Sequence, residues 1–124
     1  MYLVGAVHPY KTDAQLILER LVAGKVRLVC DAEVLQENLH RYVAIDRRKS
    51  IDTALGVLLG LVDEVLPIER SDVMREAAIV SGPGKHGARD AIHLAVMERY
   101  GIGSIVSFDR DFDRWLGIVR IFQA

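Results

Sequence analysis

Helical segments alternate with short, nearly continuous apolar runs along this 124-residue chain, and few folds accommodate that order. Apolar residues that recur every three or four positions predict amphipathic helices, and short valine-, isoleucine- and leucine-rich runs predict strands buried on both faces. Such strands, separated by helices, form a mostly parallel sheet covered by helices on both sides, so we predict an α/β fold. The predicted helices span residues 9–23, 32–45, 50–63, 71–81 and 88–100, and the predicted strands span residues 26–30, 65–68, 104–108 and 118–122.

Several residues mark the expected ends of these elements. Pro9 suits the first turn of the first helix, and Asp31 and Ser71 can cap the second and the fourth. Pro67 cannot donate a ladder hydrogen bond, which places the second predicted strand at a sheet edge. The glycine-rich loop at residues 82–87 is not a phosphate-binding P-loop, because no strand precedes it and its spacing differs from that motif.

Composition and charge exclude several classes of protein. The chain is 51% hydrophobic and 27% charged, which is typical of one globular domain over residues 1–124. The net charge of -1 provides no global positive field, so any contact with nucleic acid would depend on local patches. The longest apolar stretch, residues 54–62, is much shorter than the roughly 20 residues that cross a membrane. Cys30 is the single cysteine, which excludes an internal disulfide and favours a reducing compartment such as the cytoplasm.

Four carboxylates are expected near one edge of the sheet, because ligands of parallel α/β sheets bind beyond the carboxyl ends of the strands. Asp109 directly follows a predicted strand, and Asp111 lies two positions on. Asp90 lies in the first turn of the preceding helix, and Glu37 lies almost two turns into the helix after the first predicted strand. Oxygen ligands from several elements can hold a hard divalent cation and leave positions for water and phosphate. The pattern therefore predicts a metal site that hydrolyses phosphodiesters.

Each of these residues could also have an ordinary structural role. Asp90 suits a helix start, Asp109 and Asp111 are common turn residues, and Glu37 could be a solvated charge. Their joint placement at one edge favours the metal site. His93 lies one turn after Asp90 and is more typical of a packed or orienting histidine than of a general base.

Basic residues beside Asp90 could contact a nucleic-acid backbone. Lys85, His86 and Arg89 surround the start of the predicted helix at residues 88–100. Phosphate contacts position a nucleic acid without reading its sequence, so Lys85 and Arg89 are candidate RNA-binding residues. A solvated loop before a helix is an equally good explanation of the same residues.

Three stretches carry a resemblance to a known family. They are residues 28–42 (LVCDAEVLQENLHRY), 87–102 (GARDAIHLAVMERYGI) and 105–114 (IVSFDRDFDR). In the order and spacing of its acidic residues the chain resembles the PIN-domain family, especially the VapC-type toxins of toxin–antitoxin pairs. The resemblance implies a single α/β domain with a parallel sheet in the order 3-2-1-4-5. It also implies a ribonuclease that depends on Mg²⁺ or Mn²⁺.

The resemblance extends to particular residues. Matched by position, Glu37, Asp90 and Asp109 correspond to the family's second, third and fourth acidic residues, and Asp111 to an additional acidic position. The resemblance thus implies that Glu37, Asp90 and Asp109 are catalytic and that all four residues bind metal. It further implies an RNA substrate and a VapB-like antitoxin. Apolar surface on the first, third and fourth predicted helices suits a homodimer or a bound antitoxin segment.

The family's first acidic residue is not found in this match. In the family a hydrophobic strand runs into an aspartate and a tyrosine follows, and Tyr2 matches that tyrosine. The strand and its aspartate are therefore expected upstream of Met1. Without that central strand, unpaired backbone groups would each cost about 1–3 kcal/mol, so we expect a poorly soluble or inactive chain. A start codon assigned too far downstream is the favoured explanation, and a truncation and a degenerate homologue stay open.

Two other functions are compatible with the sequence. A catalytically inactive PIN-like module would bind RNA or antitoxin without cleaving RNA. A phosphohydrolase or receiver-like domain also places aspartates after parallel strands, and its nucleophile would be Asp31 or Asp109. The chain lacks a lysine at the position that a receiver-like site requires, which makes this the weaker alternative.

Overall fold

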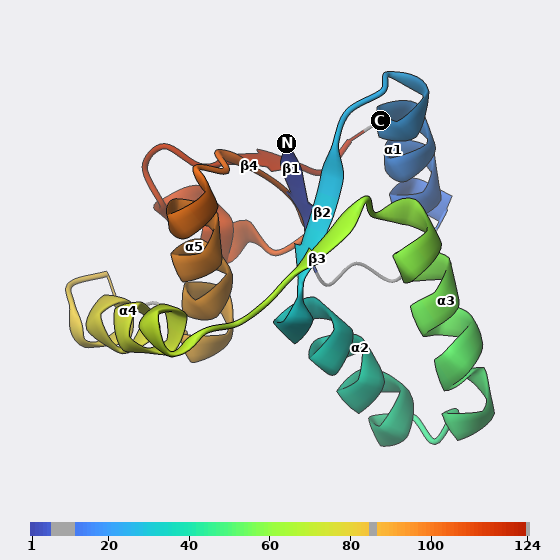
Figure 1. Cartoon of the computed structure of the whole chain (residues 1–124), viewed down its shortest axis with the longest axis horizontal. Helices are drawn as coiled ribbons and strands as arrows, with labels where there is room; N and C mark the ends of the chain where they lie inside the picture. The colour runs from blue at the N-terminus through green and yellow to red at the C-terminus, as the bar shows by residue number, and fades with distance from the viewer. Residues whose placement is uncertain (6–11, 85–86, 124) are drawn as a thin grey trace.

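The computed structural model describes residues 1–5, 12–84 and 87–123 and shows a five-stranded sheet between two layers of helices (Figure 1). All neighbouring strands pair in parallel, in the order β3-β2-β1-β4-β5, which confirms the predicted α/β class and strand order. The strands are β1 (Tyr2–Val4), β2 (Leu28–Asp31), β3 (Glu64–Leu66), β4 (Ser104–Val106) and β5 (Val119–Ile121). The helices are α1 (Thr12–Ala23), α2 (Ala32–Ala44), α3 (Ile51–Leu61), α4 (Arg70–Ser81) and α5 (Ala88–Tyr100), with 3-10 turns η1 (Arg48–Ser50) and η2 (Arg110–Arg114).

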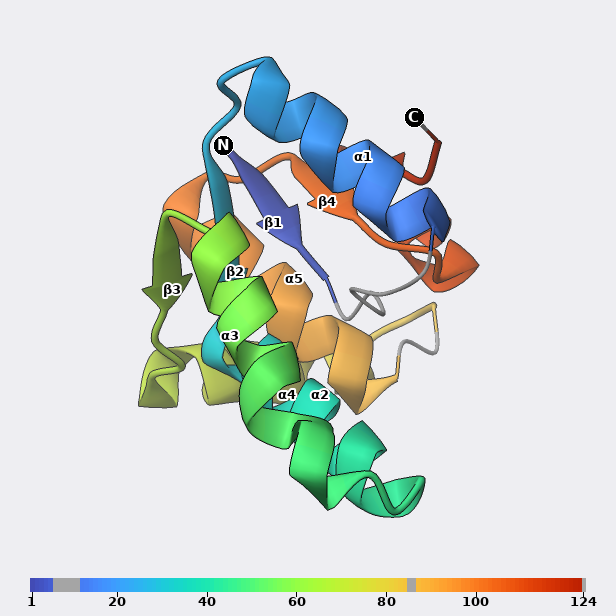
Figure 2. The same ribbon diagram turned by 90° about the vertical axis from the view of Figure 1, so that its right-hand side faces the viewer.

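Successive residues of the inner strands face opposite layers of helices. Leu3 and Ile105 belong to a buried cluster with α4 and α5, whereas Val4 and Val106 belong to a cluster with α1, α2 and α3. Figure 1 shows α4 and α5 on one side of the sheet and α1 and α3 on the other, and Figure 2 shows α1 alongside β1 and β4. Because both faces are covered, the inner strands are apolar at consecutive positions.

The central strand is present, contrary to the prediction from the sequence. Tyr2 and Leu3 of β1 pair with β2, and Tyr2, Leu3 and Val4 pair with β4. Leu3 and Val4 are completely buried. The expectation of an empty central position in the sheet was wrong, because a strand of three residues is too short to show a periodicity in the sequence. The inner edges of β2 and β4 are both bonded to β1, so the physical reason for expecting an insoluble or inactive chain no longer applies.

Local sequence signals place most of the other element ends. The Asp31 side chain caps α2 by accepting a hydrogen bond from the Val34 backbone N at 3.0 Å, as predicted. β3 lies at an edge of the sheet, as Pro67 indicated. Helix α1 is described from Thr12, and the predicted start of that helix, residues 9–11, lies outside the described residues.

The start of α4 differs from the prediction. Glu69, not Ser71, occupies the N-cap position, and the Asp72 side chain accepts a hydrogen bond from the Glu69 backbone N at 2.8 Å. Asp72 is 2% exposed and also accepts two hydrogen bonds from Arg99 of α5, at 2.8 and 2.9 Å. Ser71 was the expected cap from residue type alone. The cap lies two residues earlier because Asp72 can then close the first turn and bind Arg99.

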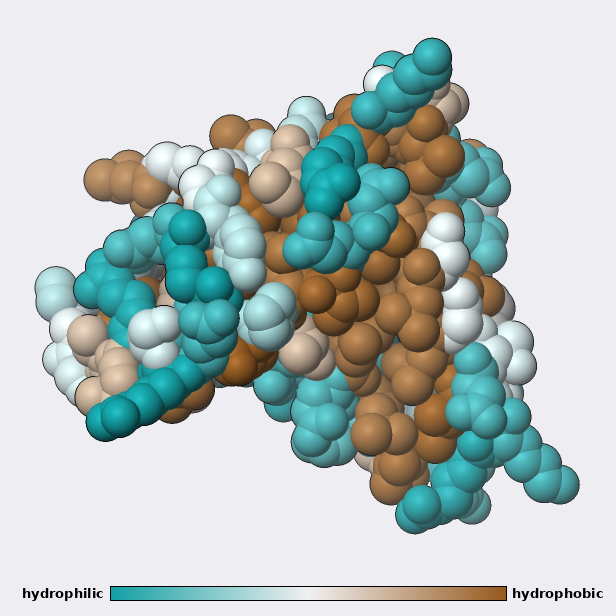
Figure 3. Space-filling model, viewed as in Figure 1, coloured by the Kyte–Doolittle hydropathy of each residue, from teal (hydrophilic) through white to brown (hydrophobic). Residues whose placement is uncertain are grey.

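Apolar side chains also reach the surface of α1, α3 and α4. Leu59 of α3 is 48% exposed and Met74 of α4 is 61% exposed, and Figure 3 shows hydrophobic surface over α3 and beside β3. Leu16 and Val22 of α1 are exposed as well. The exposed apolar residues expected on these helices are therefore present. Within the described ranges, no helix is both long enough and apolar enough to cross a membrane.

Candidate metal centre

A cavity of about 170 Å³ lies at the carboxyl-terminal edge of the sheet. It lies where β1 and β4 end, and α2, α5 and η2 complete its walls. The edge is the one that the sequence singled out for ligand binding. The residues that line it are Gly5, Glu37, Arg89, Asp90, His93, Ser107, Phe108, Asp109 and Phe112.

Three of the four candidate acidic residues lie within reach of a single ion. One carboxylate oxygen from each of Asp90, Asp109 and Asp111 lies within 4.8 Å of the others. Asp90 projects from the first turn of α5, and the two other residues lie at the start of the turn after β4. The Asp109 side chain accepts a hydrogen bond from the Asp111 backbone N at 2.9 Å, which fixes the shape of this turn. Residues about 20 positions apart in the sequence are thus brought to one point.

The electrostatics of this cluster favour a bound cation. Burial, followed by the negative charges of Asp109 and Asp111, raises the pKa of Asp90 to about 6, although His93 opposes the rise. Carboxylates held this close repel one another when ionised, and a divalent cation between them removes that repulsion. Oxygen-only ligands suit Mg²⁺ or Mn²⁺ better than softer metals. The donor set therefore fits the cations that the resemblance implies.

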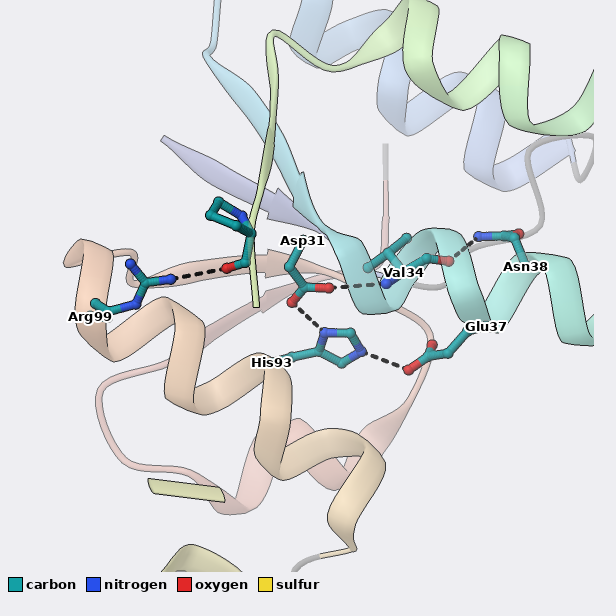
Figure 4. A network of polar contacts seen from close by, with 7 residues as sticks. Asp31, Val34, Glu37, Asn38, His93 and Arg99 are labelled. Atoms are coloured by element: carbon teal, nitrogen blue, oxygen red, sulfur yellow. Dashed lines mark hydrogen bonds and ion pairs between the residues drawn. The ribbon is translucent and has the colours of Figure 1, made fainter. Parts of the chain in front are cut away.

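Glu37 lines the same cavity, but it is bonded to His93 (Figure 4). The Nε2 atom of His93 lies 2.8 Å from Oε1 of Glu37, and its Nδ1 atom lies 2.6 Å from Oδ2 of Asp31. The side chains of Asp31, His93 and Glu37 are 0%, 3% and 11% exposed. An ionised carboxylate can only accept, so each ring nitrogen donates to one carboxylate and the ring is an imidazolium.

His93 keeps its charge at neutral pH despite its burial. Burial alone would lower the pKa of His93, but hydrogen bonds to Asp31 and Glu37 and their negative charges raise it to about 10. The orienting contact considered for His93 is therefore present, although the sequence did not reveal Asp31 as its partner. The two residues are 62 positions apart, and the available signal was that Asp31 ends a strand at the same sheet edge. Asp31 is fully buried with both oxygens bonded, which argues against its alternative role as a phosphorylated nucleophile.

Gly5 occupies the end of the central strand. It directly follows β1 and lines the cavity. Its backbone N donates to the Val106 carbonyl oxygen at 2.9 Å, and a Cβ atom at Gly5 would lie 3.0 Å from that oxygen. The end of β1 therefore offers no side chain to an ion in this cavity.

The candidate RNA-binding residues are only partly described. Arg89 is exposed and lines both the cavity and an adjoining hollow that also includes His40 and Arg41. Lys85 lies outside the described residues. Arg89 therefore lies where a phosphate next to the acidic cluster could contact it.

The parallel sheet and the acidic edge define a PIN domain, and residues 2–115 match the family model of that name. The chain is 54% identical over 121 residues to ribonuclease VapC13 of Mycobacterium tuberculosis, an alignment that covers 98% of this chain and 92% of that protein. The chain therefore belongs to the PIN-domain family, and within it to the VapC group.

Solved structures with the same fold include VapC toxins. The crystal structure of M. tuberculosis VapC20, a sarcin-ricin loop cleaving toxin, has a TM-score of 0.71 at 21% identity and covers 91% of this chain and 93% of its own. The structure of VapBC2 from Rickettsia felis, bound to a promoter DNA fragment, has a TM-score of 0.76 at 14% identity. The match covers 97% of this chain and 96% of that chain. At these identities the likeness supports the fold alone.

Proposed function

We propose that residues 1–124 form one PIN domain that acts as a metal-dependent endoribonuclease toxin of the VapC type. The observation that carries this proposal is the meeting of Asp90, Asp109 and Asp111 beside a cavity that Glu37, Asp90 and Asp109 line. The 54% identity to a protein named a ribonuclease supports the same reaction. RNA phosphodiesters are the proposed substrate.

In this function the acidic residues of the cavity would act together on one phosphate. A bound Mg²⁺ or Mn²⁺ would polarise the phosphate and lower the pKa of the attacking water. Asp90, Asp109 and Asp111 would hold the ion, which requires Asp90 to be ionised, and Glu37 would complete the catalytic set. Arg89, together with Lys85, would contact phosphates of the RNA and position the RNA strand without reading its base sequence.

Cleavage of RNA by the purified 124-residue protein tests this function. We expect cleavage with Mg²⁺ or Mn²⁺, and loss of cleavage with a chelator or with Asp109→Asn. Asp52→Asn is a matched control, because Asp52 is exposed on α3 and does not line the cavity. Cleavage that persists in Asp109→Asn, or that needs no metal, would contradict the proposal.

Gly5 favours a second candidate function, a catalytically inactive module that binds RNA or antitoxin. The end of β1 contributes no carboxylate to the cavity, so an ion would have fewer ligands than the family pattern provides. This function predicts RNA binding without cleavage in both metals. A gel-shift assay with RNA in Mg²⁺ or Mn²⁺ separates the two cases: bound RNA that stays intact supports the inactive module, and cleaved RNA rejects it.

The proposed protein partners are a VapB-like antitoxin and a second copy of the chain. The R. felis structure contains a VapBC pair, and exposed apolar residues such as Leu59 and Met74 provide surface for a partner. Light scattering of the chain with and without a co-expressed antitoxin would measure both assemblies. We place the protein in the cytoplasm, where the free, buried thiol of Cys30 stays reduced.

A further inference from the structure

Glu37 differs in its contacts from the three clustered aspartates. Asp90, Asp109 and Asp111 form the group whose oxygens can share an ion, and Glu37 is not part of that group. Its Oε1 atom instead accepts a hydrogen bond from His93 at 2.8 Å. Charge-assisted hydrogen bonds are among the strongest in proteins, so His93 restricts the orientation of this carboxylate.

The other ring nitrogen of His93 is bonded to Asp31, at the end of a strand. Asp31 ends β2 and is completely buried, with Oδ2 on His93 at 2.6 Å and Oδ1 on the Val34 backbone N at 3.0 Å. If His93 turned toward another partner, the Asp31 carboxylate would be left buried without its cation, which is strongly unfavourable. His93 is therefore held in place, and it holds Glu37 in turn.

The other side of the cavity supplies no compensating ligand at the end of β1. Gly5 has no side chain there, and the close Val106 carbonyl oxygen leaves no room for a Cβ without adjustment. Direct ligands then come from α5 and the η2 turn, where the three clustered aspartates lie.

We propose that Asp31 and His93 are positioning residues for Glu37, which His93 holds at the edge of the metal site. This inference rests on the metal site of the proposed function, but it concerns a different property from cleavage. It assigns the buried Asp31 a role in the site that its capping of α2 alone does not require.

The test follows the proton of the His93 Nε2–H group by NMR while Mg²⁺ is added to the 124-residue protein. We expect a downfield signal that is lost in His93→Gln, shifted in Glu37→Gln and unchanged in the control His40→Gln, which alters an exposed histidine of α2. The signal should persist when Mg²⁺ saturates the site. Its disappearance at saturation would show that Glu37 leaves His93 for the ion, and would overturn the inference.

Kinetics give a second measurement. His93→Gln should lower kcat and leave KM for RNA unchanged, whereas a purely structural role would lower the amount of folded protein and leave kcat per folded molecule unchanged.

The outcomes also separate this inference from the proposed function. If the protein binds Mg²⁺ and retains the His93 signal but does not cleave RNA, only the proposed nuclease activity is rejected. A protein that cleaves RNA but loses the signal with Mg²⁺ rejects only the role assigned to Glu37. Absence of any Mg²⁺ or Mn²⁺ binding rejects both.

Discussion

Replacement of His93 by leucine should destabilise the fold by about 3–5 kcal/mol, because it leaves a buried carboxylate without its cation. Asp31 is completely buried, and His93 lies 2.6 Å from it on the side away from the helix cap. Leucine is similar in size to histidine, so the change removes the charge and both ring donors without opening a large cavity. For a domain of this size the loss corresponds to a fall in Tm of roughly 10–20 °C.

The pH dependence of this effect has a defined sign. The folded-state pKa of His93 is raised to about 10 by its partners Asp31 and Glu37, against an ordinary value of 6.5. A raised pKa means that the stabilisation is fully present below the ordinary value and is lost as the pH rises through the folded value. The gap in unfolding free energy between the protein and His93→Leu should therefore be greatest below about pH 6.5, shrink as the pH rises from there, and be lost above about pH 10.

Urea unfolding followed by circular dichroism at several pH values measures this gap. The double variant Asp31→Asn with His93→Leu is the matched control, because it removes both charges and asparagine still caps α2 well. We expect the double variant to be more stable than His93→Leu alone. The reasoning would be refuted if His93→Leu lost less than about 1 kcal/mol, or if the double variant were no more stable than the single one.

Three further predictions follow from the structure. Gly5→Ala should lower the unfolding free energy by about 1–3 kcal/mol through overpacking, because the new Cβ would lie 3.0 Å from the Val106 carbonyl oxygen. The control Gly56→Ala should not destabilise the chain, because its Cβ would meet nothing within 4 Å. Equal urea midpoints for the two variants would contradict this prediction. Asp72→Asn should lower Tm at pH 7, and this effect should shrink as acid protonates Asp72. Burial raises the pKa of Asp72, but the hydrogen bond from Arg99 outweighs burial and holds the pKa below its ordinary value. An effect that does not depend on pH would argue against the ion pair. Mn²⁺ at 100 times its Kd should stabilise the protein by about 2.7 kcal/mol in a thermal-shift assay but not Asp109→Asn, and equal shifts would place the ion elsewhere.

Local patterns were sufficient to predict the order of the longer elements and the chemistry of several positions. Helical periodicity identified the five helices of the described residues, and residue type identified the Asp31 cap and the edge position of β3. These features depend on neighbours within one or two turns, which the sequence displays directly. The placement of Asp109 and Asp111 after a strand, and of Asp90 at a helix start, likewise follows from the element boundaries.

Pairings between distant segments were decided only by the tertiary structure. A strand as short as β1 becomes recognisable only when Leu3 and Val4 are placed between β2 and β4. The Asp31–His93–Glu37 contacts exist because the ends of β2 and α5 meet at one sheet edge, and sequence spacing carries no trace of that meeting. The sequence alone therefore determined which elements form and which side chains they offer. The packing of those elements decided the charge state of His93, the partner of Glu37 and the place of Gly5 in the cavity, because each depends on burial and on contacts between segments far apart in the chain.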